Sequence, residues 1–270
     1  MIKKIFIIFI TIALIFVCSC GLKEGRQGKK KHLITIAGST SVMPFVEKLA
    51  EYFMLQNTNF IIDVQGGGST AGIQACINNT VHLGMSSRKL KEGERLNEII
   101  ICYDGISVVV HPSNPINGLS MEQVRAIFSG KIKNWKELGW INRRIDAITR
   151  EEGSGTRGSF EELVMKNEEI DDSIMVQDSN GSVKEIVATD PYAIGYISLG
   201  LVDKRVKALT IDGVVPTVSN IKTGAYKITR PFLFLSNGEP DDRTREFIEF
   251  VLSKQGQDLL RREGLIGSYE

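Results

Sequence analysis

Residues 33–50 read LITIAGSTSVMPFVEKLA, and this stretch decides the fold. Its first part, 33–37, is apolar or β-branched, which predicts a short strand that ends at Gly38. Apolar residues then recur at helical spacing from 41 to 54, which predicts a helix. Small polar residues lie between the two, so the unit is a strand, a polar turn and a helix.

The order of strand, polar turn and helix recurs further along the chain. Alternating apolar residues predict a strand at 60–65, GGGST at 66–70 predicts a loop, and 71–78 predicts a helix. Residues 81–85 predict a further strand, which leads into Ser86-Ser87-Arg88. Strands that alternate with helices are typical of an α/β fold with a largely parallel sheet.

A second unit follows the segment HPSNP at 111–115, whose two prolines predict a connection and the first crossover between domains. The expected strands are 103–110, 143–149, 193–198 and 230–236, and the expected helices are 120–128 and 158–166. The strand at 193–198 lies in YAIGYISL, which we interpret as core packing rather than binding. One long amphipathic helix is expected at 242–263, packed on the first domain.

Length and composition restrict the class of protein. A chain of 270 residues more often folds as two domains than as one, and 42% hydrophobic with 24% charged residues is ordinary for a globular chain. Collagen, low complexity and bulk disorder are excluded. Residues 32–270 hold 26 basic and 31 acidic residues, which argues against nucleic acid as a partner. Any anion bound there must be held by local dipoles rather than by the net field.

The N-terminus has the features of a targeting segment. Residues 1–19 combine two early lysines with an apolar run at 5–17 that is shorter than a membrane-spanning helix, so we expect a signal peptide. The order Val17-Cys18-Ser19-Cys20 resembles the bacterial lipobox, which implies cleavage before Cys20 and lipidation of this cysteine. A retained membrane anchor is the alternative. Residues 20–32 predict a flexible basic tether that can lie against anionic headgroups.

The chain has four cysteines, and two of them, Cys76 and Cys102, lie outside the lipobox. Neither stands in a spacing that is typical of zinc ligands. Each lies in an apolar segment, so we expect two buried small hydrophobes, with a disulfide as the alternative. His32, His82 and His111 are isolated in the sequence and are expected to be structural.

Three polar loops are candidates for binding an anion. Gly38–Ser41, GGGST at 66–70 and Glu152–Thr156 each precede an expected helix, where unpaired amides and the helix dipole present partial positive charge. Arg150, just before the third loop, adds a forked and permanent cation. An ordinary helix N-cap explains any one loop alone. Three such loops on two domains indicate an oxyanion held in a cleft.

In the order and spacing of seven segments, the chain resembles the phosphate-binding lipoprotein family of the bacterial phosphate ABC transporter. These segments are LITIAGSTSVMPFVEKLA, IDVQGGGSTAGIQA, LGMSSRKL, YDGISVVVHPSNP, ITREEGSGTRGSFEEL, DPYAIGYISLG and ITRPFLFLS, of which REEGSGTR is the most specific part. The resemblance implies an α/β, two-domain type II periplasmic-binding-protein fold with two interdomain crossovers and a ligand cleft. We expect domain I at 33–110 and 229–270, and domain II at 111–228.

The resemblance also implies a site and partners. The expected phosphate contacts are Thr40, Ser41, Ser69, Ser87, Asp104, Arg150, Ser154, Gly155 and Thr156. The implied function is high-affinity capture of inorganic phosphate outside the membrane and delivery to the transmembrane permease subunits of a phosphate ABC importer. We expect a monomer, lipid-anchored at the cell membrane, with no catalytic residues, no metal, no cofactor and no nucleic acid partner.

One position departs from the family pattern. Many longer members carry an Asp directly after the Ser of the third loop, where this chain has Ser87. A carboxylate there accepts the proton of monohydrogen phosphate and repels sulfate, which has none. Asp104 is the candidate acceptor, and a strand-end Asp is the alternative. Arg88 and Arg157 are candidates for phosphate contact or interdomain ion pairs, with surface charges as the alternative. Asn180-Gly181-Ser182 is a weaker candidate for the cleft.

Three rival functions stay open at this point. The first is a receptor for another tetrahedral oxyanion, such as sulfate, molybdate or a phosphorylated metabolite. The presence or absence of a proton acceptor at Asp104 distinguishes it from a phosphate receptor. A hydrolase would need GxSxG, but the second glycine of Gly153-Ser154-Gly155 comes one residue early and no histidine is placed as a base. A sensor or adhesin is the third, because a fold does not determine a function.

Overall fold

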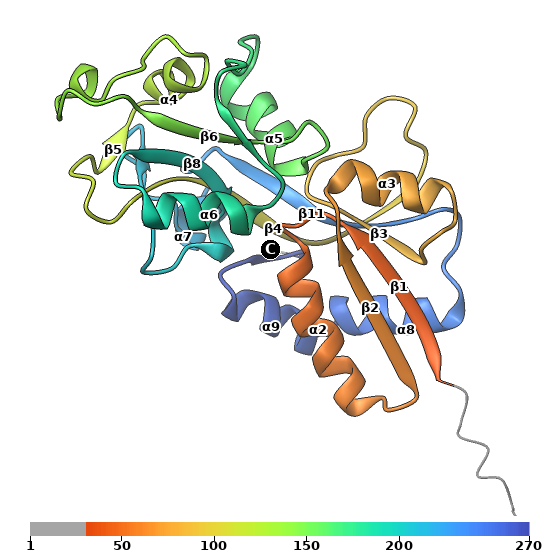
Figure 1. Cartoon of the computed structure of the whole chain (residues 1–270). Coiled ribbons are helices and arrows are strands. Elements are labelled where there is room, and N and C mark those ends of the chain that lie inside the picture. The colour runs from red at the N-terminus through yellow and green to blue at the C-terminus, as the bar shows by residue number, and fades with distance from the viewer. Residues whose placement is uncertain (1–30, 270) are drawn as a thin grey trace, which may run out of the picture. The chain divides into compact units, whose positions relative to one another are not determined.

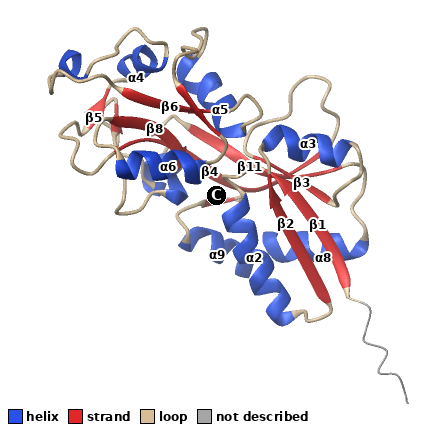
Figure 2. Ribbon diagram, viewed as in Figure 1, coloured by secondary structure: helices blue, strands red, loops and turns tan. Residues whose placement is uncertain are grey.

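A computed structural model describes residues 31–269 (Figures 1 and 2). The expected signal peptide, Cys20 and nearly all of the basic tether lie outside these residues. Between residues 31 and 269, no helix is both long and apolar enough to cross a membrane. The described chain is a mixed α/β structure in which helices flank the strands of one long sheet (Figure 2).

The first half of the sheet begins with the strand that was predicted at 33–37. β1 (His32–Gly38) is parallel to β2 (Phe60–Gly66) and β3 (Leu83–Ser86). β11 (Thr229–Ser236) lies between β3 and β4 (Asn97–Val110) and is antiparallel to both. The expectation of a largely parallel sheet is therefore only partly correct, because β11 returns from the second half of the chain and enters the sheet in the opposite direction.

β4 carries the sheet into its second half. Residues 97–105 pair with β11, and residues 106–110 pair with β8 (Ala193–Ser198). β6 (Asp146–Arg150) is parallel to β8 and to β7 (Met175–Gln177), which gives the order β2-β1-β3-β11-β4-β8-β6-β7. The short strands are β5 (Gly118–Leu119), β9 (Lys207–Ala208), β10 (Thr210–Ile211) and β12 (Ile266–Gly267).

The helices lie close to the stretches with apolar periodicity. They are α2 (Met43–Gln56), α3 (Ser69–Ile77), α4 (Met121–Phe128), α5 (Gly155–Phe160), α6 (Asn180–Thr189), α7 (Val218–Lys222), α8 (Asp242–Leu252) and α9 (Lys254–Arg262). Short turns are η1 (Trp135–Leu138), η3 (Leu199–Leu201) and the π-helical η2 (Glu161–Met165), which continues α5. α5 begins three residues before the expected start at 158, because Ser154 caps it.

Two main hydrophobic cores lie along this sheet. In the first, α2 and α8 pack on β1 and β2, while α3 packs on β1, β3 and β11 from the opposite face of the sheet (Figure 1). In the second, Phe128 of α4 and Phe160 of α5 pack against Tyr196 of β8, with Phe160 and Tyr196 stacked at 3.9 Å between ring centroids. We call β1–β3, β11, α2, α3, α8 and α9 the first lobe, and β5–β10 with α4–α7 the second lobe.

The chain passes between the lobes inside β4. Cys102 lies in the first core, whereas Ile106 and Val108 lie in the second. This passage precedes the 111–115 segment that was expected to form the crossover. The chain returns just before β11, where the Ile106 N–H donates to the carbonyl of Ile228 at 2.9 Å. The residue bounds expected for the two domains stay a prediction.

The expectation of one long helix at 242–263 is wrong. Ser253 ends α8 and begins α9 with an extended backbone, φ −64° and ψ 163°, and its Oγ accepts a hydrogen bond from the Gly256 N–H. The serine side chain thus offers the backbone an alternative to a continuous helix. Both helices pack on the first core, as expected, through residues such as Phe247 and Leu260.

Other expectations about the core are confirmed. Cys76 and Cys102 are free and buried. β8 is buried at every position, so YAIGYISL packs as a core strand. The two cysteines and the side chains of β8 therefore stabilise the fold by the burial of apolar surface.

The close approach of α3 to β1 depends on Gly72. A Cβ atom at this position would lie 2.6 Å from the carbonyl oxygen of Ala37 and 2.6 Å from the Cα of Gly38. A hydrogen atom fits where a methyl group would not. The N-terminus of α3 can therefore reach the turn after β1, which brings the loops 38–41 and 66–70 together.

We predict that Gly72→Ala lowers the free energy of unfolding by about 1–3 kcal/mol, because the methyl group forces α3 away from β1. Denaturant unfolding followed by circular dichroism measures this change. Gly181→Ala in α6 is the matched control, because the nearest atom to its Cβ is Ser179 Oγ at 3.7 Å. It should be neutral or slightly stabilising. Equal losses in both variants would contradict the packing argument.

Candidate anion-binding site

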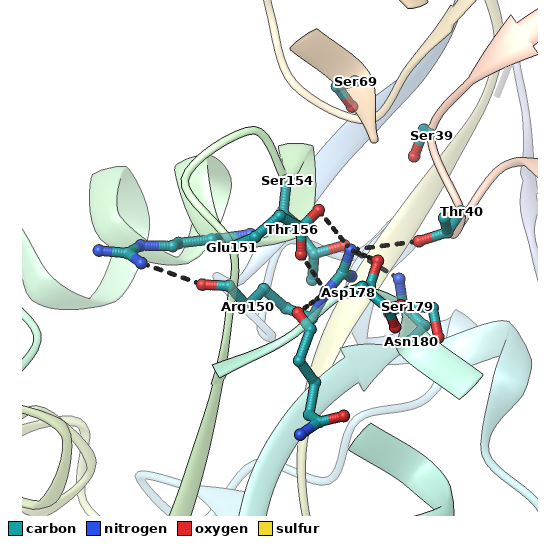
Figure 3. A network of polar contacts seen from close by, with 12 residues as sticks. Ser39, Thr40, Ser69, Arg150, Glu151, Ser154, Thr156, Asp178, Ser179 and Asn180 are labelled. Carbon is teal, nitrogen blue, oxygen red and sulfur yellow. Dashed lines mark hydrogen bonds and ion pairs between the residues drawn. The ribbon is translucent and has the colours of Figure 1, made fainter. Parts of the chain in front are cut away.

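The candidate site lies at the carboxyl ends of β1, β3 and β6, the edge at which α/β sheets bind ligands. A Cβ on Gly155 would lie 2.1 Å from Ser69 Oγ and 2.5 Å from Ser87 Oγ. The Thr70 N–H also donates to the carbonyl of Gly153 at 3.0 Å. The loops singled out in the sequence therefore meet, from both lobes (Figure 3).

Four buried serines of the first lobe, Ser39, Ser41, Ser69 and Ser87, form what we call the serine cluster. Ser39 Oγ lies 2.9 Å from Ser41 Oγ and 2.9 Å from Ser87 Oγ. Ser69 Oγ accepts the backbone N–H of Ser87 at 3.1 Å. Ser69 is also the first residue of α3, so this hydroxyl lies at the positive end of a helix dipole. Such a cluster offers several short-range donors to one small anion.

Arg150 brings a guanidinium from the second lobe, with its side chain only 1% exposed. Its Nε and Nη2 donate to the Glu151 carboxylate at 3.0 and 2.9 Å, and Nη2 also donates to Thr40 Oγ1 at 3.2 Å (Figure 3). Its Nη1 is buried and has no hydrogen-bond partner among the residues of the described chain. Because an unpaired buried donor is costly, Nη1 marks a place where an acceptor is needed.

The third loop provides both a helix cap and further donors. Ser154 is the N-cap of α5, and its Oγ accepts the Arg157 N–H at 3.2 Å. Thr156 Oγ1 accepts from Nδ2 of Asn180 at 3.3 Å. The Ser198 N–H donates to Oδ1 of Asn180 at 3.1 Å, which orients this amide. Asn180 begins α6, so a second helix N-terminus lies beside that of α5.

Asp104 and Arg230 form a buried ion pair on adjacent strands. The register of β4 and β11 places their Cα atoms opposite each other, and Asp104 Oδ2 accepts from Nη2 and Nε of Arg230 at 2.9 and 3.1 Å. Burial raises the pKa of Asp104, and the charge of Arg230 opposes this rise. Burial also lowers the pKa of Arg230. These two charge-assisted hydrogen bonds to one carboxylate oxygen favour the ionised pair. Arg230 Nη1 donates to Ser87 Oγ at 3.2 Å, so the pair adjoins the serine cluster.

The structure places most of the predicted contacts together. The residues that gather around Arg150 and the serine cluster are Thr40, Ser41, Ser69, Ser87, Arg150, Ser154, Gly155 and Thr156. Asp104 lies behind Ser87 and reaches it through Arg230. Arg88 is held by Glu94 at 2.8 Å and Arg157 by Glu161 at 2.7 Å, so each is engaged in an ion pair within its own lobe.

The sequence analysis does not identify Arg230. It places Ser39 in the first candidate loop without naming it as a contact, and it gives Asn180 as a candidate for the cleft. The signal for Arg230 was present, because Asp104 and Arg230 are single charges in the otherwise apolar strands YDGISVVV and TRPFLFLS. Buried charges are normally paired, so two lone opposite charges in core strands predict an ion pair.

The chemistry that these groups can perform is anion binding. They are hydroxyls, helix N-termini and guanidinium groups, and His82 and His111 are bonded elsewhere, to Thr35 and Ser113. In the part of the chain that the structure describes, no group of three His, Cys, Asp or Glu side chains could hold a metal ion.

Comparison with known proteins gives the family. Residues 24–255 match the model of the PBP superfamily domain. The phosphate-binding protein PstS of Bacillus subtilis is 34% identical over 242 residues, which are 87% of this chain and 80% of that protein. The chain belongs to the PBP superfamily and, within it, to the PstS family.

Solved structures support this PstS-family assignment. A putative phosphate ABC transporter substrate-binding protein of Clostridium perfringens, with bound phosphate, is 40% identical with a TM-score of 0.85, over 87% of this chain and 99% of that chain. An ABC-type phosphate transport receptor of Vibrio cholerae is 38% identical with a TM-score of 0.72, over 86% and 99%. The expected two-domain periplasmic-binding-protein fold is thereby confirmed.

We predict that Asp104→Asn lowers the free energy of unfolding of this PstS-family protein by about 3–5 kcal/mol, because it leaves the Arg230 charge buried without its partner. Asp258→Asn in α9 is the control, since Asp258 pairs with Lys254 and Arg261 on the surface and its loss should leave the denaturation midpoint unchanged. Chemical denaturation of both variants measures the difference. A midpoint for Asp104→Asn equal to the wild type would contradict the structural importance of the pair.

Proposed function

We propose that this chain is an extracytoplasmic receptor that binds one inorganic phosphate ion between its lobes and delivers it to the permease of an ABC-type importer. The observation that carries the proposal is the unpartnered Nη1 of Arg150, buried beside hydroxyls and helix N-termini from both lobes. Support comes from relatives that are named phosphate-binding proteins and from the C. perfringens structure, which contains phosphate.

The proposed contacts are local donors. Thr40, Ser41, Ser69, Ser87, Ser154 and Thr156 offer hydroxyls, Gly155 offers a backbone amide without a side chain in the way, and Arg150 offers charge. These groups act inside the protein, where a hydrogen bond to a charged ligand is stronger than in water. An acidic body can thus hold an anion without an attractive net field.

The proposal involves no covalent chemistry. Ser154 of the GSG turn uses its Oγ as a helix cap, while His82 and His111 are bonded elsewhere, to Thr35 and Ser113. Closure of the two lobes around the ligand is the proposed mechanism of capture, and opening against the permease is the proposed mechanism of release. The protein acts as a monomer and needs no cofactor.

Arg150→Gln should weaken phosphate binding by about 2–5 kcal/mol, because the anion loses its main countercharge. Calorimetric titration of the ligand-stripped protein measures this. Arg125→Gln is the control with the same loss of charge, since Arg125 lies in α4 and donates to the carbonyl of Val164. An Arg150→Gln variant that binds phosphate as tightly as the wild type would refute the site, and a wild type that binds none would refute the function.

The membrane anchor is part of the proposal and is supported by the sequence alone. We propose that Cys20 carries the lipid and that the basic tether follows it. Cys20→Ala should move the protein from the membrane fraction of the producing bacterium to the soluble extracytoplasmic fraction, whereas the control Cys18→Ala should stay with the membrane. Release by Cys18→Ala instead would show that the lipidated residue was assigned wrongly.

A further inference from the structure

We propose that the hydroxyl of Ser159 is an interlobe latch, which raises the affinity for the bound anion without touching it. Its hydrogen bond to the backbone carbonyl of Ser87 stabilises the closed arrangement, in which the loops of the two lobes meet. This inference rests on the proposed function and specifies what holds that site closed. Ser159 is therefore a positioning residue and not one of the proposed phosphate contacts.

The hydroxyl of Ser159 crosses the boundary between the lobes. Ser159 lies in α5 of the second lobe and is 3% exposed, and its Oγ donates to the carbonyl oxygen of Ser87 at 3.1 Å. Ser87 directly follows β3 in the first lobe. A serine inside a helix usually bonds back to a carbonyl one turn earlier or faces solvent. Here the hydroxyl instead joins two residues that are 72 positions apart in the sequence.

Small residues on one face of α5 allow this contact. Gly155, Gly158 and Ser159 follow the spacing i, i+3 and i+4, so they lie on the same side of the helix. A Cβ on Gly155 would lie 2.1 Å from Ser69 Oγ, and one on Gly158 would lie 3.3 Å from Cδ of Arg88. Both of these neighbours belong to the first lobe. Larger side chains on this face of α5 would hold the lobes apart.

A second hydrogen bond joins the lobes without using a side chain. The backbone N–H of Thr70, in the first turn of α3, donates to the carbonyl of Gly153 in the loop before α5 at 3.0 Å. The helices α3 and α5, which come from different lobes, accordingly lie next to each other (Figure 1). Because this bond uses backbone groups only, no substitution removes it cleanly. The Ser159 bond, in contrast, is removed by deleting one oxygen atom.

The latch changes the balance between open and closed lobes. When the lobes separate, water can hydrogen-bond both the Ser159 hydroxyl and the Ser87 carbonyl, so the bond contributes a modest net gain. In the closed arrangement Ser87 is fully buried, and a variant without the hydroxyl leaves its carbonyl without this donor. A buried acceptor that loses its donor is costly. Loss of the hydroxyl therefore penalises the closed arrangement and leaves the open one unchanged.

Closure follows the entry of the anion, because the closed site is shielded from solvent. Ser69, Ser154 and Thr156 are at most 2% exposed, so an ion reaches them only while the lobes are apart. The latch then forms after binding, and it must break before release. Its loss is expected to speed the release of the anion and to change its association little.

Calorimetric titration of the full chain, stripped of ligand, with inorganic phosphate tests this. Ser159→Ala should raise the dissociation constant about three- to tenfold, the effect of one lost interlobe hydrogen bond. Ser236→Ala is the matched control, because Ser236 is also buried and its Oγ donates to the carbonyl of Gly238 within the first lobe at 2.9 Å. It should bind phosphate like the wild type. Equal affinity in Ser159→Ala and the wild type would overturn the latch and leave the proposed function standing.

The rate of phosphate release separates a latch from a general loss of stability. Stopped-flow measurement should give faster release in Ser159→Ala by the same factor as its loss of affinity, while Ser236→Ala releases phosphate at the wild-type rate. Slower association with unchanged release would overturn the latch, and so would an equal loss of affinity in both variants. A wild type that binds no phosphate would overturn the proposed function and the latch together.

Discussion

The rest of this structure depends on the Asp104–Arg230 ion pair, which links β4 to β11. It lies where the chain passes from the first lobe to the second in β4 and where it returns before β11. Each charge alone would be costly in an apolar strand, whereas two hydrogen bonds from the guanidinium to one carboxylate oxygen pair the opposite charges. The same guanidinium donates to Ser87 Oγ. Arg230 therefore contributes both to the connection between the lobes and to the polar lining of the site.

Because residues 32–270 hold more acidic than basic residues, an anion bound there must be held by short-range interactions. Here the donors are brought close by backbone positions that lack a side chain, such as Gly72 of α3, which lies against β1, and Gly155, which lies against the serine cluster. Helix N-termini and buried guanidinium groups then act over a few ångströms in a medium with few competing waters. The distant acidic surface contributes little at this range because solvent and salt screen it.

Helix capping and ligand binding turn out to be compatible roles for one hydroxyl. Ser154 caps α5 through a lone pair, which leaves its proton available. The sequence analysis offers an ordinary N-cap and an anion contact as alternatives for such a serine. Ser154 can fill both roles. The cap even favours binding, because it fixes the orientation of the hydroxyl.

The sequence by itself determined the strand–turn–helix units, the core strands at β1, β2 and β8, and the three polar loops, since these follow from local periodicity and turn chemistry. The motif around Arg150 also identified the family. It did not show the antiparallel entry of β11, the break at Ser253 or the role of Arg230. Each of these depends on partners far along the chain: 126 positions separate Asp104 from Arg230. Only the tertiary structure decided that Asp104 faces an arginine and not an open site, because β4 and β11 are far apart in the sequence and their pairing places the two charges opposite each other.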